Sequence, residues 1–507
     1  MNLADRLRAT AQRLPEKVAV YIAGHRGRHG HDLTYADLDA RADRAASAFQ
    51  ELGLRPRDRV GLGLGNSPYF VEAWYGAMRA GLVAVPLNTG STTEEVAYIL
   101  GDSGARAVVV SEAFYPVLAG LEQELPGLDE VVVAGASAPP IGAQTWQQLL
   151  DASPGTPHPV EIGDGELALL QYTSGATGRP KGAMLSHRNL LANQEQMRQT
   201  RLRPLERDVV LCVLPLFHLY ALNVGLALPL SCGASVLLAE RFDPVQTIEQ
   251  IVAYRASVII GAPPMYIAWA NLPAIERYDL ACVRFAVSGA APLPHSVPRW
   301  FNEQLGIPLW EGYGLTETSP VLTFAASDPQ PPGSVGQPVP GVQLRLVDDY
   351  GRRVPEGELG EVVVRGPNVF SGYWNAPAAT VQAIDSGGWF HTGDIGYLSD
   401  GELFLVDRKS DLIVVSGFNV YPREVEDVLY RHPKVAEAAV IGMPHPYTGE
   451  AVKAVVVLRP GEEATAEEIT LFCNRWIARF KCPEVVEFVD RLPHLPTGKV
   501  RRRDLRS

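Results

Sequence analysis

The chain has 507 residues, more than one ordinary hydrophobic core can hold, so at least two domains are expected. Its apolar content of 46% is typical of a soluble globular protein, and its net charge of −12 argues against a nucleic-acid partner, which needs a basic surface. Five scattered cysteines without a CxxC pair predict no disulfide framework and no zinc site, and they favour a reducing cytoplasm.

The first third of the chain alternates helical and extended patterns. Residues 1–14 mix charged and apolar positions without the apolar core of a signal peptide, so an amphipathic helix is expected there. A parallel α/β sheet follows from the alternation. The expected helices are 33–55, with Thr34 as cap, 68–81 and 92–101, and the expected strands are 59–64, 83–86, 107–110 and 131–134. Residues 134–165, rich in Ala, Gly and Pro, predict a surface connection.

A glycine-rich loop follows the apolar run 167–172, which predicts a buried strand. Glycines let the backbone approach a ligand closely, so that N–H groups converge on phosphate oxygens, while hydroxyls add donors and Lys181 adds charge. The loop is not a Walker A motif, because Pro180 precedes the lysine. The residues expected to cradle phosphate are Thr173, Ser174, Gly175, Ala176, Thr177, Gly178 and Lys181.

The stretch 209–239 contains no charged residue up to its last position, which is long enough to suggest a membrane span. Prolines, glycines and polar residues interrupt it, so we expect no span. The interrupted pattern instead predicts a buried strand (209–214), a helix (about 221–230) and a second strand (234–239).

The remainder divides into three parts. Strand patterns at 257–261 and 285–289 continue the α/β alternation, and short strands from about 333 predict a small β-rich subdomain. After the charged stretch 407–411, strands near 413–415, 436–441 and 452–458 and a helix at 466–479 predict a compact α+β segment. We therefore expect a large domain over 1–406 and a C-terminal domain over 407–507.

Four motifs together resemble one superfamily: TSGATGRPKG (173–182), WEGYGLTETSP (310–320), TGD (392–394) and VDRKSDLIVVSGFNVYPREVED (406–427). They resemble the adenylate-forming, AMP-binding enzymes: acyl-CoA synthetases, luciferases and peptide-synthetase adenylation domains. The region from Val406 is most similar to bacterial long-chain fatty-acid–CoA ligases, and LPLFHLYALN (214–223) resembles plant 4-coumarate–CoA ligases. The resemblance implies a large α/β domain with a β-rich subdomain, followed by a small mobile lid.

The resemblance also implies a two-step reaction. A carboxylic acid is a poor acyl donor, and joining it to AMP supplies a good leaving group. The carboxylate would attack the α-phosphate of ATP and release pyrophosphate, and the thiol of CoA would then displace AMP. Cations are needed where a carboxylate meets a triphosphate, so ATP, Mg²⁺ and CoA are the expected cofactors.

The motifs assign roles to single residues by resemblance. Glu317 and Thr173 would hold magnesium, Thr316 would contact phosphate, Tyr313 would stack on adenine, and Asp394 would bind the ribose hydroxyls. The other residues expected at the nucleotide are Gly289, Ala290, Ala291, Glu311, Gly312, Gly314 and Arg408. The expected catalytic residues are Lys499, Lys181, Glu317 and His218.

Lys499 would stabilise charge in the first step and leave before the second. The hinge for that rotation is expected near 407–410, where Ser410 stands in place of the usual Asp or Lys. Ser416, Gly417 and Phe418 would then line the tunnel for the pantetheine of CoA.

The acyl pocket is predicted to be apolar. Peptide-synthetase domains hold an amino acid's ammonium with an Asp that follows a Phe, and His218 takes that place here. An unpaired ammonium would be costly to bury, so a fatty acid of medium or long chain is the leading substrate, and an aryl acid resembling coumarate is the second. The expected lining is His218, Leu219, Tyr220, Leu222, Val224, Met265, Val321 and Leu322.

An ATP-dependent acyl-CoA ligase is the leading hypothesis. The alternatives are an acyl-AMP ligase that loads an acyl carrier protein, a luciferase-like oxygenase, and a nucleotide-binding protein without catalysis. The intact tunnel motif favours a free thiol over a carrier protein, and retention of both lysines, Glu317 and Asp394 argues against the last. A homodimer is one expectation for the assembly.

Overall fold

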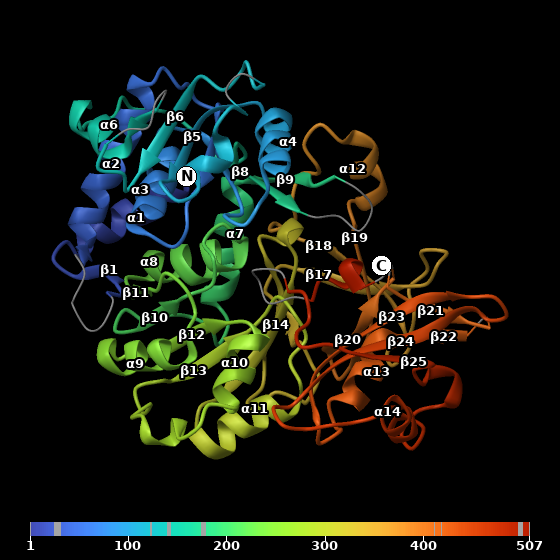
Figure 1. The fold of residues 1–507 in the computed structure, drawn as a ribbon. Helices are drawn as coiled ribbons and strands as arrows, with labels where there is room; N and C mark the ends of the chain where they lie inside the picture. The colour runs from blue at the N-terminus through green and yellow to red at the C-terminus, as the bar shows by residue number, and fades with distance from the viewer. Residues whose placement is uncertain are drawn as a thin grey trace.

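The structure is a computed structural model that describes residues 2–24, 32–121, 124–138, 143–173, 179–409, 411–416, 418–494 and 500–505 (Figure 1). It has the expected fold: parallel α/β sheets in a large N-terminal domain, and a smaller C-terminal domain. Helix α1 (Leu3–Arg13) begins at Asn2, whose side chain accepts from the amide of Ala4 at 2.9 Å, and it buries Leu3 and Leu7. The amphipathic N-terminal helix is therefore confirmed.

The first sheet has seven strands in the order β7-β6-β5-β3-β4-β8-β9, parallel except for the antiparallel pair β8–β9. Its strands are β3 (Arg59–Gly63), β4 (Val83–Pro86), β5 (Ala105–Ser111), β6 (Glu130–Ala134), β7 (Gln144–Thr145), β8 (Leu167–Thr173) and β9 (Lys181–Ser186). The helices that accompany it are α2 (Tyr35–Glu51), α3 (Pro68–Arg79), α4 (Thr93–Ser103), α5 (Tyr115–Leu118) and α6 (Trp146–Ala152). Thr34 caps α2 through its hydroxyl, as predicted.

One part of the predicted surface connection 134–165 is structured. Strand β7 and helix α6 form there, because Thr145 caps the helix and Trp146, Leu149 and Leu150 place one apolar face in the core. The indole of Trp146 donates a hydrogen bond of 3.0 Å to the buried carboxylate of Glu72. The sequence did not predict this short helix, because its apolar face spans less than two turns and shows no clear helical period.

The second sheet has nine strands in the order β16-β15-β14-β13-β12-β10-β11-β1-β2, parallel from β1 to β14. Its strands are β1 (Val18–Ile22), β2 (Leu33–Thr34), β10 (Val209–Cys212), β11 (Ser235–Leu238), β12 (Val258–Gly261), β13 (Phe285–Ser288), β14 (Leu309–Gly314), β15 (Val321–Phe324) and β16 (Gln337–Pro338). The helices beside it are α7 (His187–Arg198), α8 (Leu228–Cys232), α9 (Pro244–Tyr254), α10 (Pro263–Ala270) and α11 (Ser296–Trp300). The hydroxyl of Ser186 caps α7 by accepting from the amide of Asn189.

The uncharged stretch 209–239 lies in the core of this sheet. Its strands are β10 and β11, and the helix between them is a π-helical segment (Tyr220–Ala227) that continues into α8. Among the residues that the structure describes, none of the helices is long and apolar enough to cross a bilayer.

The β-rich subdomain is a four-stranded antiparallel sheet of β17 (Gln343–Val347), β18 (Gly360–Arg365), β19 (Phe390–Ser399) and β20 (Glu402–Arg408). Helix α12 (Pro377–Ala383) lies between β18 and β19 in the chain. Strand β20 extends through the predicted domain boundary near 407, which stays a prediction.

The C-terminal domain has its own sheet and its own core, which includes Ile413, Val425 and Val440. Its elements are β21 (Ile413–Val415), β22 (Phe418–Val420), α13 (Pro422–Leu429), β23 (Val435–His445), β24 (Gly449–Leu458), α14 (Ala466–Cys473) and β25 (Val485–Phe488). Helix α14 is shorter than the predicted 466–479, because the chain turns after Cys473 and then leads to strand β25. The last described residues form a short helix (Arg502–Leu505), and Val500 and Leu505 pack in a small apolar cluster with Ala439 of β23.

Candidate active site

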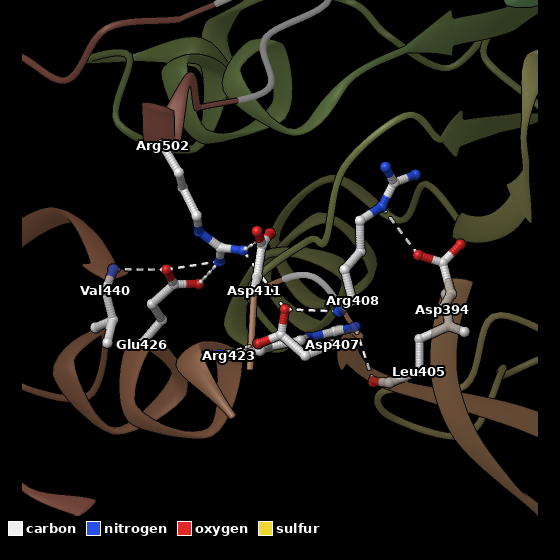
Figure 2. Close-up of polar contacts among 9 residues, drawn as sticks. All are labelled: Asp394, Leu405, Asp407, Arg408, Asp411, Arg423, Glu426, Val440 and Arg502. Atoms are coloured by element: carbon white, nitrogen blue, oxygen red, sulfur yellow. Dashed lines mark hydrogen bonds and ion pairs between the residues drawn. The ribbon is translucent and has the colours of Figure 1, made fainter. Parts of the chain in front are cut away.

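Two of the predicted nucleotide motifs meet where β14 ends beside β19. Tyr313, near the end of β14, donates from Oη to Oδ2 of Asp394 at 2.5 Å. Arg408 donates from Nε to Oδ1 of the same carboxylate at 3.0 Å (Figure 2). Asp394 is only 6% exposed, and burial together with this carboxylate raises the pKa of the Tyr313 hydroxyl. The ring predicted for adenine and the carboxylate predicted for ribose therefore lie in contact.

A second group surrounds Glu317, the predicted magnesium ligand. Glu317 lies in a short 3-10 helix (Thr316–Thr318) and is buried, and Oε1 accepts from the hydroxyl of Tyr373 at 2.8 Å. The Lys181 ammonium lies 5.5 Å from the centre of the Tyr373 ring. Thr173 is the cross-strand partner of Lys181 in the β8–β9 pair. Through Tyr373 the structure thus connects Lys181 of the predicted phosphate loop with Glu317, the predicted magnesium ligand.

This group fits a magnesium ion in one specific way. Within the described ranges, no cluster of three or more His, Cys, Asp or Glu could hold a metal by itself. Mg²⁺ is usually held by one or two carboxylates and by the phosphates of its substrate, with waters completing the octahedron. A single buried carboxylate at Glu317 matches that pattern, with Thr173 at the end of β8 as the proposed second oxygen ligand, so the ion would arrive with ATP.

Close backbone approach shapes the end of β14. A Cβ added at Gly314 would lie 1.8 Å from the carbonyl oxygen of Pro320, so any other residue there would force the strands apart. The glycine therefore allows the end of β14 to pass close to Pro320, just after the short helix that carries Thr316 and Glu317. Gly312, two residues earlier, has a similar role: an added Cβ would lie 3.1 Å from the ring of Phe324.

The segment that follows β13 carries Gly289, Ala290 and Ala291, predicted to lie along adenine. Ala290 has a backbone φ of +72°, a conformation that residues other than glycine rarely adopt. A Cβ at Gly289 would lie 3.1 Å from the ring of Tyr220, so the ring packs directly on this glycine. The nucleotide segment and the predicted acyl pocket therefore share one contact.

Glu311, also on β14, is buried, and burial raises the pKa of its carboxyl to about 7, although the nearby Arg423 of α13 opposes that shift. Its backbone is fixed by Gln330, whose Oε1 accepts from the amide at 2.7 Å and whose Nε2 donates to the carbonyl at 3.1 Å. Gln330 belongs to none of the motifs, and Arg423 lies within the 406–427 motif but was not assigned a role, so the sequence did not indicate either residue at this site.

His218 follows Phe217, and the two rings lie 5.3 Å apart between centres. Gln171 of β8 donates to the carbonyl of Phe217 at 3.1 Å, which ties that strand to the segment carrying His218. Burial lowers the pKa of His218 to about 4, so its imidazole is neutral at pH 7. The other predicted pocket residues are apolar and mostly buried: Leu219, Leu222, Val224, Met265, Val321 and Leu322.

Other predicted site residues lie elsewhere or outside the described residues. Ser416 and Phe418 are exposed at the β21–β22 hairpin, which Figure 1 shows at the outer edge of the C-terminal domain, far from β14. Phe418 is 58% exposed, and its ring centre lies 5.0 Å from that of Phe480. The predictions that lie outside the described residues are those for Ser174, Gly175, Ala176, Thr177, Gly178, Ser410, Gly417 and Lys499.

A family model described as AMP-binding enzyme matches residues 7–374, and its C-terminal domain model matches residues 424–499. The chain therefore belongs to the AMP-binding enzymes.

Its relatives define the class further. It is 36% identical to 4-coumarate:CoA ligase 1 of Petunia hybrida, over 95% of this chain and 90% of that protein. It is 34% identical to the long-chain-fatty-acid–CoA ligase of Bacillus subtilis (strain 168), over 99% of this chain and 94% of that protein. The crystal structure of the anthranilate CoA ligase AuaEII with anthranoyl-AMP superposes with a TM-score of 0.93 at 30% identity, over 100% of this chain and 96% of that one. The protein is an AMP-forming acyl- or aryl-CoA ligase, a class that uses ATP and CoA.

Proposed function

We propose that this ligase activates a fatty acid of medium or long chain and transfers it to CoA. The character of the predicted pocket carries the proposal: six of its side chains are buried and apolar, and the run from Leu219 to Leu230 has no carboxylate. An acyl chain gains about 0.8 kcal/mol for each methylene buried against such a lining. A neutral His218 adds no charge to this lining.

The residues take their roles from this arrangement. Lys181 lies over the ring of Tyr373, which binds Glu317, and Thr173 is the strand partner of Lys181; these residues would hold the triphosphate and its magnesium ion. Asp394 would accept hydrogen bonds from the ribose hydroxyls, and Tyr313 would stack on adenine. The carboxylate of the acid would form a bond to the α-phosphorus as the bond to pyrophosphate breaks. Lys499 would stabilise the charge that develops in this step.

The second step requires a different arrangement. Ser416, Gly417 and Phe418 would have to reach the acyl-AMP, and in this structure the described members of that set face solvent. A rotation of the C-terminal domain about residues 407–410 would move Lys499 away from the acyl-AMP and bring the β21–β22 hairpin toward it. The CoA thiol would then form a bond to the acyl carbon as the bond to AMP breaks.

An aryl acid is the second candidate. Tyr220 favours it, because its ring packs on Gly289 and its hydroxyl donates to the carbonyl of Val287 at 3.4 Å. A rigid aromatic ring held there would present a flat wall to a planar acid. A cytoplasmic location, a homodimer and an acyl carrier protein as acceptor stay predictions of the sequence.

A pyrophosphate-release assay over a panel of acids, with and without CoA, tests the proposal. We expect kcat/KM to rise from butyrate to dodecanoate and to exceed the value for coumarate. Higher activity with coumarate or benzoate would replace the fatty acid by the aryl acid. An α-amino acid that outperforms octanoate, dodecanoate and coumarate would contradict both assignments.

A further inference from the structure

The carboxylate of Asp407 lies where the two domains join, and three separate parts of the chain donate hydrogen bonds to it (Figure 2). Its own strand supplies the amide of Arg408 at 2.8 Å, and the first turn of α13 supplies the amide of Arg423 at 2.8 Å. The guanidinium of Arg502, from the chain end, lies 3.5 Å away. The Asp407 side chain is only 4% exposed. We name Asp407, Arg423 and Arg502 the Asp407 cluster.

Arg502 belongs to the C-terminal domain and reaches back to β20. Its Nη2 makes two bonds of 2.8 Å to the carboxylate of Glu426, and its Nη1 lies 3.1 Å from Asp411. Glu426 also accepts from the amide of Val440 at 2.8 Å. Glu426, Asp411 and Arg502 all lie beyond residue 410, so a rotation of the C-terminal domain would leave these contacts intact. Of the Arg502 contacts named here, the one with Asp407 joins the C-terminal domain to β20 and would be broken by such a rotation.

Arg423 also joins the C-terminal domain to β20. Its Nη1 donates to the carbonyl of Leu405 at 3.0 Å, in addition to the bond from its amide to Asp407. Asp407 thus acts on the start of α13 as an N-cap supplied by the other domain, and its negative charge is favourable at that helix end. A rotation about residues 407–410 must break these bonds and separate a buried carboxylate from its partners, which is costly unless water or new donors replace them.

The same strand continues into the nucleotide site. Arg408, next to Asp407, binds Asp394, which in turn accepts from Tyr313. In this orientation the chain end lies against β20, while Ser416 and Phe418 face solvent. The cluster therefore holds the orientation in which the hairpin predicted to bind CoA faces solvent, and under the proposed function this orientation would serve acyl-AMP formation rather than thioester formation.

We propose that Asp407 and Arg502 are positioning residues that hold the C-terminal domain against β20 for the first half-reaction and so set the balance between the two half-reactions. The inference rests on the proposed two-step function. Neither side chain touches the reacting atoms, so each acts through the orientation of the domain.

The test uses the full-length enzyme with Asp407→Asn, which keeps the shape of the side chain and removes its charge. Arg501→Gln is the matched control, because Arg501 lies on the same chain end but pairs with the exposed Asp504. Acyl-AMP formation should fall about tenfold in Asp407→Asn, as expected for the loss of one charge-assisted contact. Thioester formation from supplied acyl-AMP should be unchanged or faster, and Arg501→Gln should match the wild type in both.

A second measurement does not depend on substrate. Trypsin cleaves after Arg408 and Lys409, and cleavage within a folded protein follows local opening. We expect Asp407→Asn to be cut there several-fold faster than the wild type, while its midpoint of urea unfolding stays the same. This result would hold even if no acid in the panel were activated, so it separates failure of the proposed function from failure of this inference.

Two outcomes would overturn the inference. Unchanged trypsin cleavage with an unchanged ratio of half-reactions would show that the cluster does not hold the domain. An equal loss in both half-reactions, together with a lower unfolding midpoint, would assign Asp407 a merely structural role. Arg502→Gln gives an independent check, because it removes the charge that faces Asp407 across residue 410, and it should shift the ratio in the same direction.

Discussion

The hydroxyl of Tyr313 lies 2.5 Å from Oδ2 of Asp394, and this bond joins two motifs that are 81 residues apart in the chain. Arg408 occupies the other carboxylate oxygen at 3.0 Å. The carboxylate is thus oriented before a nucleotide arrives, with its charge partly neutralised by Arg408. Preorganisation of this kind lowers the cost of binding a ribose.

Asp394→Asn should therefore raise the KM for ATP roughly tenfold, because an amide accepts hydroxyl protons less strongly than a carboxylate. Tyr313→Phe should raise it less, since the ring remains and Arg408 still holds Asp394. Initial rates at varied ATP measure both. An unchanged KM in Asp394→Asn would remove Asp394 from the nucleotide site.

Glu317→Gln should weaken the dependence of turnover on Mg²⁺. The buried carboxylate accepts only the hydroxyl of Tyr373 among the hydrogen bonds found in the described parts of the chain, and an amide is a poor ligand for a hard cation. Titration of activity with MgCl₂ should show the half-maximal concentration shifted upward by about tenfold or more. Glu358→Gln, at an exposed position, is the control. A superimposable titration for Glu317→Gln would contradict the assignment.

Lys499→Ala should lower acyl-AMP formation by roughly 10²-fold or more, the usual effect of removing one preorganised charge contact. Thioester formation from supplied acyl-AMP should survive, because the lysine would have left by then. Single-turnover measurements of the two half-reactions provide the comparison. Equal losses in both would exclude the two-orientation mechanism.

Gly417→Leu is expected to have the reverse effect. A leucine would fill the proposed pantetheine tunnel and leave the ATP site open, so pyrophosphate release should persist while transfer to CoA fails. Transfer to CoA at the wild-type rate would place the tunnel elsewhere.

His187 should make stability depend on pH. It is buried, its Nδ1 accepts from the amide of Leu3 at 3.2 Å, and burial lowers its pKa from 6.5 to about 4. Between these values the unfolded chain binds a proton that the folded chain does not, so the free energy of unfolding falls as pH drops from 6.5 to 4, by at most about 3 kcal/mol for this residue.

His187→Asn should flatten that part of the profile, because the amide oxygen can accept from Leu3 and does not titrate. Urea unfolding at pH 4.5 and pH 7.5 measures it, with the exposed His158→Asn as control. If His187→Asn loses as much stability on acidification as the wild type does, another group is responsible.

Local patterns in the sequence determined the strands and helices, the glycine-rich loop, and the motifs around Tyr313, Glu317 and Asp394. These features depend on residues close together in the chain, where periodicity, capping and glycine content act directly. Helix α6 was missed because its apolar face is too short to show a period.

Only the tertiary structure decided which residues face one another. Tyr373 binds Glu317 from 56 positions away, and Arg502 approaches Asp407 from 95 positions away. Neither pair has a local signal, because a tyrosine or an arginine carries the same donors wherever it stands in the chain. The placement of the hairpin with Ser416 and Phe418 in solvent was likewise a matter of domain orientation, which depends on contacts between domains rather than on either segment's own sequence.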